Sequence, residues 1–308
     1  MYFENILKAV GHTPLVKLNR IVPEGSANVY VKYEGVNIGG SIKTRTALNM
    51  IEAAEKQGLL HKGSIIVEPS SGNQGIGLAL VGAVKGYKVK IVLPDSVSGE
   101  RKKLIENYGA EVVLVHDAGD IGKCIAECLN TALDLAKKDS NVFVPHQFEN
   151  INNTNAHKLY TAQEILNDFD QEIHGFCSGI GTGGTITGVG GVLKEKYPNM
   201  LVWAIEPENA AILSGKPIGT HIQMGIGDGL IPEILDTKIY DDICIVPDAD
   251  AVQTAKRLAR EEGLMCGISS GSNVYTALKM AKLLGKGKNV ITILPDTAER
   301  YFSTELFE

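Results

Sequence analysis

Residues 175–185 read Gly-Phe-Cys-Ser-Gly-Ile-Gly-Thr-Gly-Gly-Thr, a short apolar strand that runs into a turn of glycine and threonine. Successive backbone N–H groups in such a turn form a concave site for an anion, and a following helix adds the positive end of its dipole. A phosphate group is the natural ligand. The stretch also fits Gly-x-Gly-x-x-Gly through Gly179, Gly181 and Gly184, so a dinucleotide site and a turn without ligand remain alternatives.

Apolar segments of strand length alternate with helical patterns along the whole chain. Strands are predicted at residues 29–33, 65–68, 89–93, 111–115, 176–178, 201–205, 243–246 and 290–294, and helices at 98–108, 121–137, 154–166, 249–262 and 272–284. Near-continuous apolar strands between helices are typical of mostly parallel sheets covered by helices. Ligands of such α/β folds bind in the loops at the carboxyl ends of strands. We expect the functional site in those loops.

Glycine is the unusual feature of the composition. The chain has 34 glycines in 308 residues, where average usage of ~7% would give about 22. Nineteen of them lie in five short stretches, at residues 35–40, 72–77, 179–191, 225–229 and 263–271. Clustered glycine indicates backbone that approaches another group closely or needs unusual dihedral angles.

Charge and cysteine content exclude several classes of protein. Thirty basic against thirty-six acidic residues give a net charge of −6, which disfavours nucleic-acid partners, and no apolar run is long enough to span a membrane. The start, residues 1–5, lacks the pattern of a secretory signal. Five cysteines without a Cys-x-x-Cys pair and scattered histidines predict no metal site. We therefore expect a cytoplasmic protein with reduced thiols.

Two further loops carry groups that suit chemistry. In residues 37–45, Lys43 follows a Gly-Gly-Ser turn, where burial would lower the pKa of its amine and favour attack on a carbonyl. A solvated surface lysine is the alternative. Residues 68–75 read Glu-Pro-Ser-Ser-Gly-Asn-Gln-Gly after a predicted strand. Their hydroxyl and amide groups suit a carboxylate, although they would also cap a helix without any ligand.

Four motifs occur in a fixed order along the chain. They are Gly-Gly-Ser-x-Lys at 39–43, Ser-Gly-Asn-x-Gly at 71–75, Gly-x-Gly-Thr-Gly-Gly-Thr at 179–185 and Gly-Ile-Ser-Ser-Gly at 267–271. This order resembles the cysteine synthase/cystathionine β-synthase family, fold-type II enzymes that depend on pyridoxal 5'-phosphate (PLP). The likeness runs nearly end to end, from residues 11–16 through His146-Gln147-Phe148 to residues 294–301. The likeness therefore strongly disfavours the dinucleotide alternative.

The resemblance implies an α/β fold of two lobes like that of the tryptophan synthase β subunit, with PLP between the lobes. A larger lobe of residues 1–46 and 152–308 would bind the PLP phosphate, and a smaller mobile lobe of residues 47–151 would bind the substrate carboxylate. Members of the family are typically homodimers, so we expect a homodimer here.

Site residues are carried over one motif at a time. Lys43 resembles the lysine that bonds to PLP and later removes the α-proton. Asn73 resembles the ligand of the phenolic oxygen, and Ser269 matches the serine that faces the pyridine nitrogen. The phosphate-binding loop would be Gly181, Thr182, Gly183, Gly184 and Thr185. The substrate-carboxylate ligands would be Ser70, Ser71, Gln74 and Gln147.

A neutral serine opposite the pyridine nitrogen does not stabilise a protonated ring, so the cofactor is a weaker electron sink. Prompt loss of a β-substituent is then favoured, followed by addition of a nucleophile to the aminoacrylate that remains. We expect β-elimination or β-replacement on a small amino acid and not transamination.

Four positions depart from the common family pattern: Ile38 for proline, Thr44 for aspartate, Gln74 for threonine, and Asp228. At the position of Asp228, sulfhydrylases usually carry a small apolar residue and cystathionine β-synthases a tyrosine. A carboxylate there would repel hydrosulfide but would serve as a general base for water, an alcohol or a thiol. A turn aspartate between two glycines is the alternative.

The favoured function is a cysteine lyase activity that releases hydrogen sulfide, with water or a thiol as second nucleophile and Asp228 as base. The first alternative is cysteine synthase, which forms L-cysteine and acetate from O-acetyl-L-serine and sulfide; dehydration of serine or threonine is the next. An alternative of another class is a catalytically silent module that binds PLP or a partner.

Overall fold

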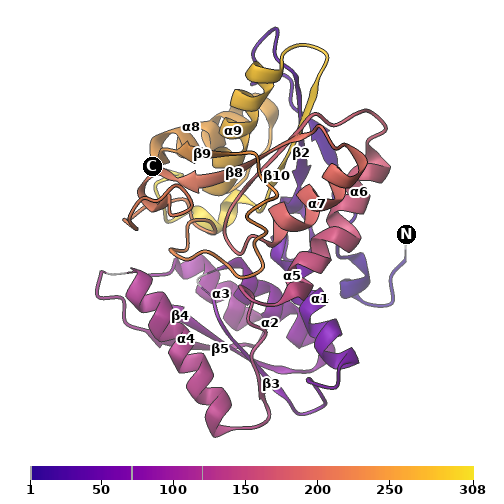
Figure 1. Cartoon of the computed structure of the whole chain (residues 1–308). Coiled ribbons are helices and arrows are strands. Elements are labelled where there is room, and N and C mark those ends of the chain that lie inside the picture. Colours follow the sequence, from indigo (N-terminus) through magenta and orange to yellow (C-terminus); the bar gives the residue numbers. More distant parts are fainter. Residues whose placement is uncertain (1, 71, 120) are drawn as a thin grey trace.

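The computed structural model describes residues 2–70, 72–119 and 121–308, and it contains two sheets covered by helices (Figure 1). The six-stranded sheet has the order β1-β2-β10-β7-β8-β9, and the four-stranded sheet the order β5-β4-β3-β6. All neighbouring strands pair in parallel except β1 with β2. The predicted α/β class with mostly parallel sheets is confirmed.

The strands of the large sheet come from both ends of the chain, whereas those of the small sheet come from its middle. The large sheet holds β1 (Leu15–Lys17), β2 (Asn28–Tyr33), β10 (Asn289–Leu294), β7 (Gly175–Gly179), β8 (Leu201–Pro207) and β9 (Asp242–Val246). The small sheet holds β5 (Glu111–Val115), β4 (Lys88–Pro94), β3 (Ile65–Pro69) and β6 (Val142–Phe143). All eight predicted strands are present, and the short β1 and β6 are additions to the prediction.

Helices connect successive strands and cover the sheets. In the small sheet's half of Figure 1 lie α1 (Lys43–Lys56), α2 (Asn73–Lys85), α3 (Gly99–Asn107) and α4 (Ile121–Lys138). The other half holds α6 (Ala162–Asp168), α7 (Gly191–Lys196), α8 (Asp248–Arg257) and α9 (Ile268–Leu284), and α5 (Ile151–Ala156) packs on α1. The predicted lobe boundaries, after residues 46 and 151, stay a prediction.

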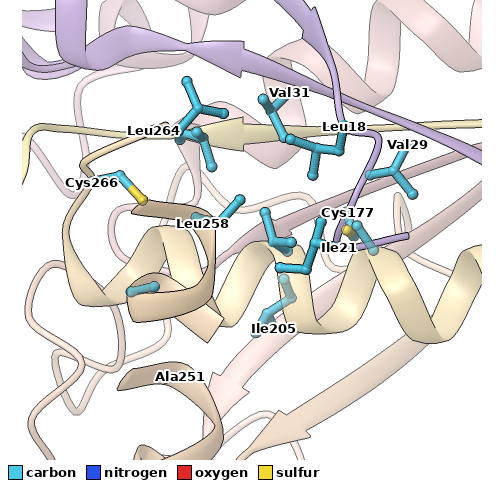
Figure 2. Close-up of a cluster of buried hydrophobic side chains, with 14 of the residues drawn as sticks. Leu18, Ile21, Val29, Val31, Cys177, Ile205, Ala251, Leu258, Leu264 and Cys266 are labelled. Atoms are coloured by element: carbon cyan, nitrogen blue, oxygen red, sulfur yellow. The ribbon is translucent and has the colours of Figure 1, made fainter. Parts of the chain in front are cut away.

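The core of the large sheet packs between its strands and helices α8 and α9. Figure 2 shows part of this cluster, which includes Val29 of β2, Ile205 of β8, Leu258 and Cys266. All five cysteines are free and buried, so their thiols act as small apolar groups in the packing. In the part of the chain that the structure describes, no helix is long and apolar enough to cross a membrane.

A buried ion network ties the first turn of α1 to the N-terminal segment, to the residue after β2 and to α6. Arg45 donates to Glu34 at 2.8 and 2.9 Å and to Glu164 at 2.6 and 2.7 Å. Lys32 lies 2.9 Å from Glu164, and Thr13 donates to Glu34 at 2.7 Å. Arg45 is two residues from Lys43, so the network fixes the start of the helix that carries this lysine.

The charges of the network support one another. Burial opposes ionisation of Glu164, but the hydrogen bonds and charges of Arg45 and Lys32 outweigh it and lower the pKa of Glu164 to about 2. Because the folded state lowers this pKa, the stabilisation is present at neutral pH and is lost as the pH falls toward 2.

Replacing Arg45 by methionine leaves Glu34 buried without its cation. We expect Arg45→Met to lower the free energy of unfolding by about 3–5 kcal/mol, measured by urea unfolding followed by circular dichroism. Lys137→Met is the control, because Lys137 and Asp134 form an exposed pair at 3.0 Å, and its loss costs at most about 1 kcal/mol. Equal effects of the two changes would contradict a structural role for the network.

Candidate active site

The loop after β7 presents unpaired backbone donors. Gly181, Thr182 and Gly183 are buried, and within the described residues their N–H groups have no hydrogen-bond acceptor. The loop leads into the helical segment η5 (Ile186–Gly190), which continues as α7. Three buried, unpaired N–H groups ahead of a helix form a site for an anion such as a phosphate.

Close packing explains why this loop is made of glycine. A Cβ atom on Gly181 would lie 2.4 Å from the carbonyl oxygen of Gly225, and one on Gly184 would lie 2.3 Å from Oδ1 of Asn153. Gly183 has a φ of +77°, which side chains with a Cβ rarely adopt. The backbone of the loop therefore touches its neighbours directly, and a larger residue would displace it.

The loop's threonines are held by residues that the sequence prediction missed. Asn153 on α5 donates through Nδ2 to Thr182 at 2.9 Å. The hydroxyl of Thr185 lies 3.3 Å from Nε2 of His157. Burial, together with the charges of Lys43 and Arg45, lowers the pKa of His157 well below its usual value, so this imidazole is neutral and can share a proton with the hydroxyl.

Lys43 is the first residue of α1 and follows a turn held by the C-terminal part of the chain. Gly39 and Gly40 have φ values of +77° and +70°, and Arg300 donates to the carbonyl of Gly39. The backbone N–H of Ile42 donates to Pro295 at 2.8 Å. The turn therefore fixes the position from which the lysine side chain starts.

Lys43 and Asp228 lie close enough to perturb each other. Burial lowers the pKa of the Lys43 amine, and the charges of Asp228 and Asp296 oppose this shift. Burial raises the pKa of the Asp228 carboxyl, and the charges of Lys43 and His221 oppose that shift. Neither residue as a whole falls in the fully buried class. The predicted pair is thus brought together.

The loop of Asp228 packs against the glycine loop at residues 181–185. The N–H of Gly227 donates to Ile180 at 2.9 Å, and Oδ2 of Asp228 lies 3.6 Å from the position of a Cβ on Gly181. His221 supports the loop from behind: its Nε2 donates to Gly227 at 3.1 Å, and its Nδ1 accepts from the N–H of Gln223 at 3.2 Å. These two contacts hold the imidazole ring against the loop.

The loop after β3 contains the predicted carboxylate ligands. Ser70 accepts from the N–H groups of Gly72 and Gly75 at 3.3 and 3.0 Å. Gln74 is buried and accepts from Thr46 at 2.7 Å through Oε1, which leaves its Nε2 without a partner. A buried amide donor without an acceptor calls for a ligand. Ser71 lies outside the described residues.

Gln147 reaches this loop because Glu68 holds its backbone. The N–H groups of His146 and Gln147 donate to Glu68 at 3.1 and 2.9 Å, and Nε2 of Gln147 donates to Pro69 at 3.2 Å. Burial raises the pKa of Glu68 to about 8, although the two N–H donors oppose the shift. Near neutral pH this carboxyl is therefore largely protonated and acts as a neutral acceptor.

Asn73 at the start of α2 is held at both ends of its amide. Its Nδ2 donates to Asp296 at 2.7 Å, and its Oδ1 accepts from Arg300 at 2.8 Å. Tyr301 donates to the same oxygen of Asp296 at 2.7 Å. Because ionised aspartate only accepts and arginine only donates, the amide has one orientation. One hydrogen of Nδ2 remains for a ligand.

Ser269 lies in the first turn of α9 and is 4% exposed. Its hydroxyl makes no hydrogen bond to another described residue, so it is available to a ligand atom. The four glycine motifs predicted from the sequence thus place hydrogen-bond donors after β3, after β7, at the start of α1 and at the start of α9.

The sequence model of a family described as "Pyridoxal-phosphate dependent enzyme" matches residues 6–296. The chain belongs to this family. It is 47% identical over 305 residues to a cysteine synthase from Staphylococcus aureus (strain Mu50 / ATCC 700699), which covers 99% of this chain and 97% of that protein. The enzyme is therefore PLP-dependent and belongs to the cysteine synthase group.

Solved structures agree with this assignment. A crystal structure of O-ureido-L-serine synthase superposes with a TM-score of 0.93 at 42% identity and covers 100% of this chain and 96% of that one. A hydrogen sulfide-producing enzyme from Fusobacterium nucleatum superposes with a TM-score of 0.92 at 42% identity, with coverage of 97% and 100%. The predicted fold-type II architecture and cofactor are confirmed.

The observed residues fit PLP. Unpaired N–H groups in the glycine loop suit its phosphate, the free hydrogen of Asn73 suits its phenolic oxygen, and the free hydroxyl of Ser269 suits its ring nitrogen. Lys43, with its lowered pKa, is the amine that would bond to its carbonyl carbon. These individual assignments stay predictions.

Asp296 fixes the orientation of the Asn73 amide, so its replacement should weaken the binding of PLP. In Asp296→Asn the amide that replaces the carboxylate no longer fixes Asn73 in one orientation. We expect the Kd of the apoenzyme for PLP to rise about tenfold, since one hydrogen bond to a charged group contributes roughly 1.5 kcal/mol.

This change is measured by titrating apoenzyme with PLP and following the visible absorbance. Glu299→Gln is the control, because Glu299 is exposed and lies three residues away. An unchanged Kd in Asp296→Asn would show that the contact does not orient a cofactor ligand.

Proposed function

We propose that this enzyme breaks the C–S bond of L-cysteine, releases hydrogen sulfide, and adds water or a thiol to the β-carbon. With water the products are L-serine and hydrogen sulfide, and with a thiol they are a thioether amino acid and hydrogen sulfide. β-Replacement on a small amino acid is the chemistry of the cysteine synthase group. The proposal goes beyond this shared chemistry in naming L-cysteine as the donor.

The observation that carries the proposal is the carboxyl of Asp228 beside Lys43. Bound PLP supplies an electron sink for negative charge at the α-carbon. The Lys43 amine, with a pKa lowered by burial, takes the α-proton. Asp228, with a pKa raised by burial, takes the proton of the incoming water or thiol, because a general base works best when its pKa is near the working pH.

The remaining site residues would bind and orient the substrate and the cofactor. Ser70, Gln74 and Gln147 would bind the α-carboxylate, and the free Nε2 of Gln74 supports this role. The glycine loop at residues 181–185 would anchor the phosphate. Oδ2 of Asp228 lies 3.6 Å from the position of a Cβ on Gly181, which supports a place for its carboxyl beside this loop.

Cysteine synthase is the second candidate, because that is the name of the Staphylococcus relative at 47% identity. In that reaction the nucleophile is hydrosulfide. At 4 Å from a carboxylate, in an effective dielectric constant of about 20, a second negative charge is opposed by about 4 kcal/mol. The hydrogen sulfide-producing relative from Fusobacterium supports the first candidate.

The alternative of a catalytically silent binding module is tested by turnover. A holoenzyme that shows the visible absorbance of bound PLP but does not turn over cysteine, serine or O-acetylserine would be a silent binding module.

The homodimer stays a prediction. It is tested by measuring the mass of the protein in solution by size-exclusion chromatography with light scattering.

Removing the carboxylate should separate the two enzyme candidates. We expect Asp228→Asn to lower the rate of sulfide release from L-cysteine about 100-fold or more, the usual contribution of a general base, and to leave cysteine synthesis from O-acetyl-L-serine and sulfide unchanged or faster. Sulfide and cysteine are measured colorimetrically, and the serine or thioether product by mass spectrometry.

Glu233→Gln is the matched control, because Glu233 is an exposed carboxylate five residues along the same segment. Undiminished sulfide release in Asp228→Asn would remove Asp228 from the mechanism. Loss of both activities together would assign it a structural role.

The acid side of the pH profile offers a separate prediction. A general base works only when deprotonated, and burial raises the pKa of Asp228, so sulfide release should fall as the pH drops through this raised pKa. In Asp228→Asn that decline should be absent from the residual activity. The measurement is kcat/KM for cysteine against pH for both proteins, and an identical acid limb in the two would exclude Asp228 as the titrating group.

A further inference from the structure

Arg101 on α3 is a buried cation without an anion. Its side chain is 4% exposed, and among the described residues no carboxylate lies within ion-pair distance of it. Its Nη1 points to the sulfur of Met224 at 2.7 Å, and its guanidinium lies 4.8 Å from the ring centre of Tyr301. Its Nε is buried and has no acceptor.

These contacts do not offset the burial of a full charge. A guanidinium is charged at every pH a protein meets, and a thioether sulfur is a weak acceptor. The face of Tyr301 contributes a cation–π interaction, but an isolated buried charge is costly unless a counter-charge and hydrogen bonds accompany it. The guanidinium of Arg101 therefore lacks a counter-charge among the described residues.

The position of Arg101 indicates which anion would supply its counter-charge. A Cβ on Gly72 would lie 3.3 Å from its Nε and 3.7 Å from its Cζ, so the guanidinium lies against the backbone of the loop that contains Ser70 and Gln74. Met224 directly precedes the loop of Asp228. Arg101 thus lies between the two loops that line the substrate side of the site.

The substrate loop itself offers no positive charge. Its predicted ligands Ser70, Gln74 and Gln147 are neutral, whereas Asp228 and Asp296 are carboxyls that act on the same site through the charge they exert on Lys43. An amino-acid carboxylate that enters such a site needs a fixed cation nearby. Arg101 lies against the backbone of this loop at Gly72, and its guanidinium stays charged.

We propose that Arg101 is a specificity-determining residue whose charge, held against the loop of Ser70, Gly72 and Gln74, selects substrates with a free α-carboxylate. It acts through the loop by orienting its backbone and stabilising the bound carboxylate. The inference rests on the proposed function, in which this loop binds the substrate carboxylate.

The test compares two ligands that differ only in that carboxylate. Holoenzyme is titrated with L-cysteine and with L-cysteinamide while the visible absorbance of bound PLP is followed. In Arg101→Gln we expect the apparent Kd for cysteine to rise at least tenfold and that for cysteinamide to change less than twofold. Arg101→Lys keeps the charge and should keep the preference for the carboxylate within about threefold of the wild type.

Lys103→Gln is the matched control, because it removes a positive charge from an exposed position on the same helix. It should change neither Kd. If Arg101→Gln weakens both ligands equally, the residue is structural and the proposal is overturned. It is also overturned if neither Kd changes. If Arg101→Gln does not fold, a lost preference in folded Arg101→Lys overturns the proposal and a retained one supports it.

The wild-type protein separates this inference from the proposed function. If wild type binds cysteine and cysteinamide equally well, the loop of Ser70, Gly72 and Gln74 does not bind a carboxylate, and both the carboxylate assignment and the role of Arg101 are wrong. If wild type prefers cysteine and Arg101→Gln shares that preference undiminished, only the role of Arg101 is wrong.

Discussion

The buried ion network around Arg45 is the constraint on which the site depends. Arg45 and Lys32 face Glu34 and Glu164 in the interior, where an unmatched charge would be costly. This balance holds the N-terminal segment, the residue after β2 and helix α6 against the first turn of α1. Lys43 is in that turn, so a reactive amine can sit at a partly open position because charges behind it are fully paired.

The rest of the site follows from placing strand ends of two sheets beside that turn. β3 contributes the loop of Ser70 and Gln74, and β7 contributes the glycine loop. The C-terminal segment joins them, because Asp296 and Arg300 hold Asn73 on α2 while Arg300 also contacts the turn before Lys43. Residues far apart in the sequence therefore orient one small group of donors.

Alternation of apolar strands and helices in the sequence was enough to predict the fold class and eight strands, and the glycine motifs located the loops. The short strands β1 and β6 carry too few residues to show a pattern. Supporting residues such as Asn153, His157 and Asp296 were missed because their roles come from contacts across the fold. Arg45 stands two residues after Lys43, yet nothing local shows that Glu164 is its partner. Unpaired donors, such as Nε2 of Gln74, are visible only in three dimensions.

The opposed pKa shifts of Lys43 and Asp228 have a common origin and a consequence for basicity. Burial disfavours both charges, and each charge partly stabilises the other. The charge of His221 also favours ionisation of Asp228. Because burial raises the pKa of Asp228, its carboxylate would be a stronger base toward a neutral nucleophile and would repel an anionic one.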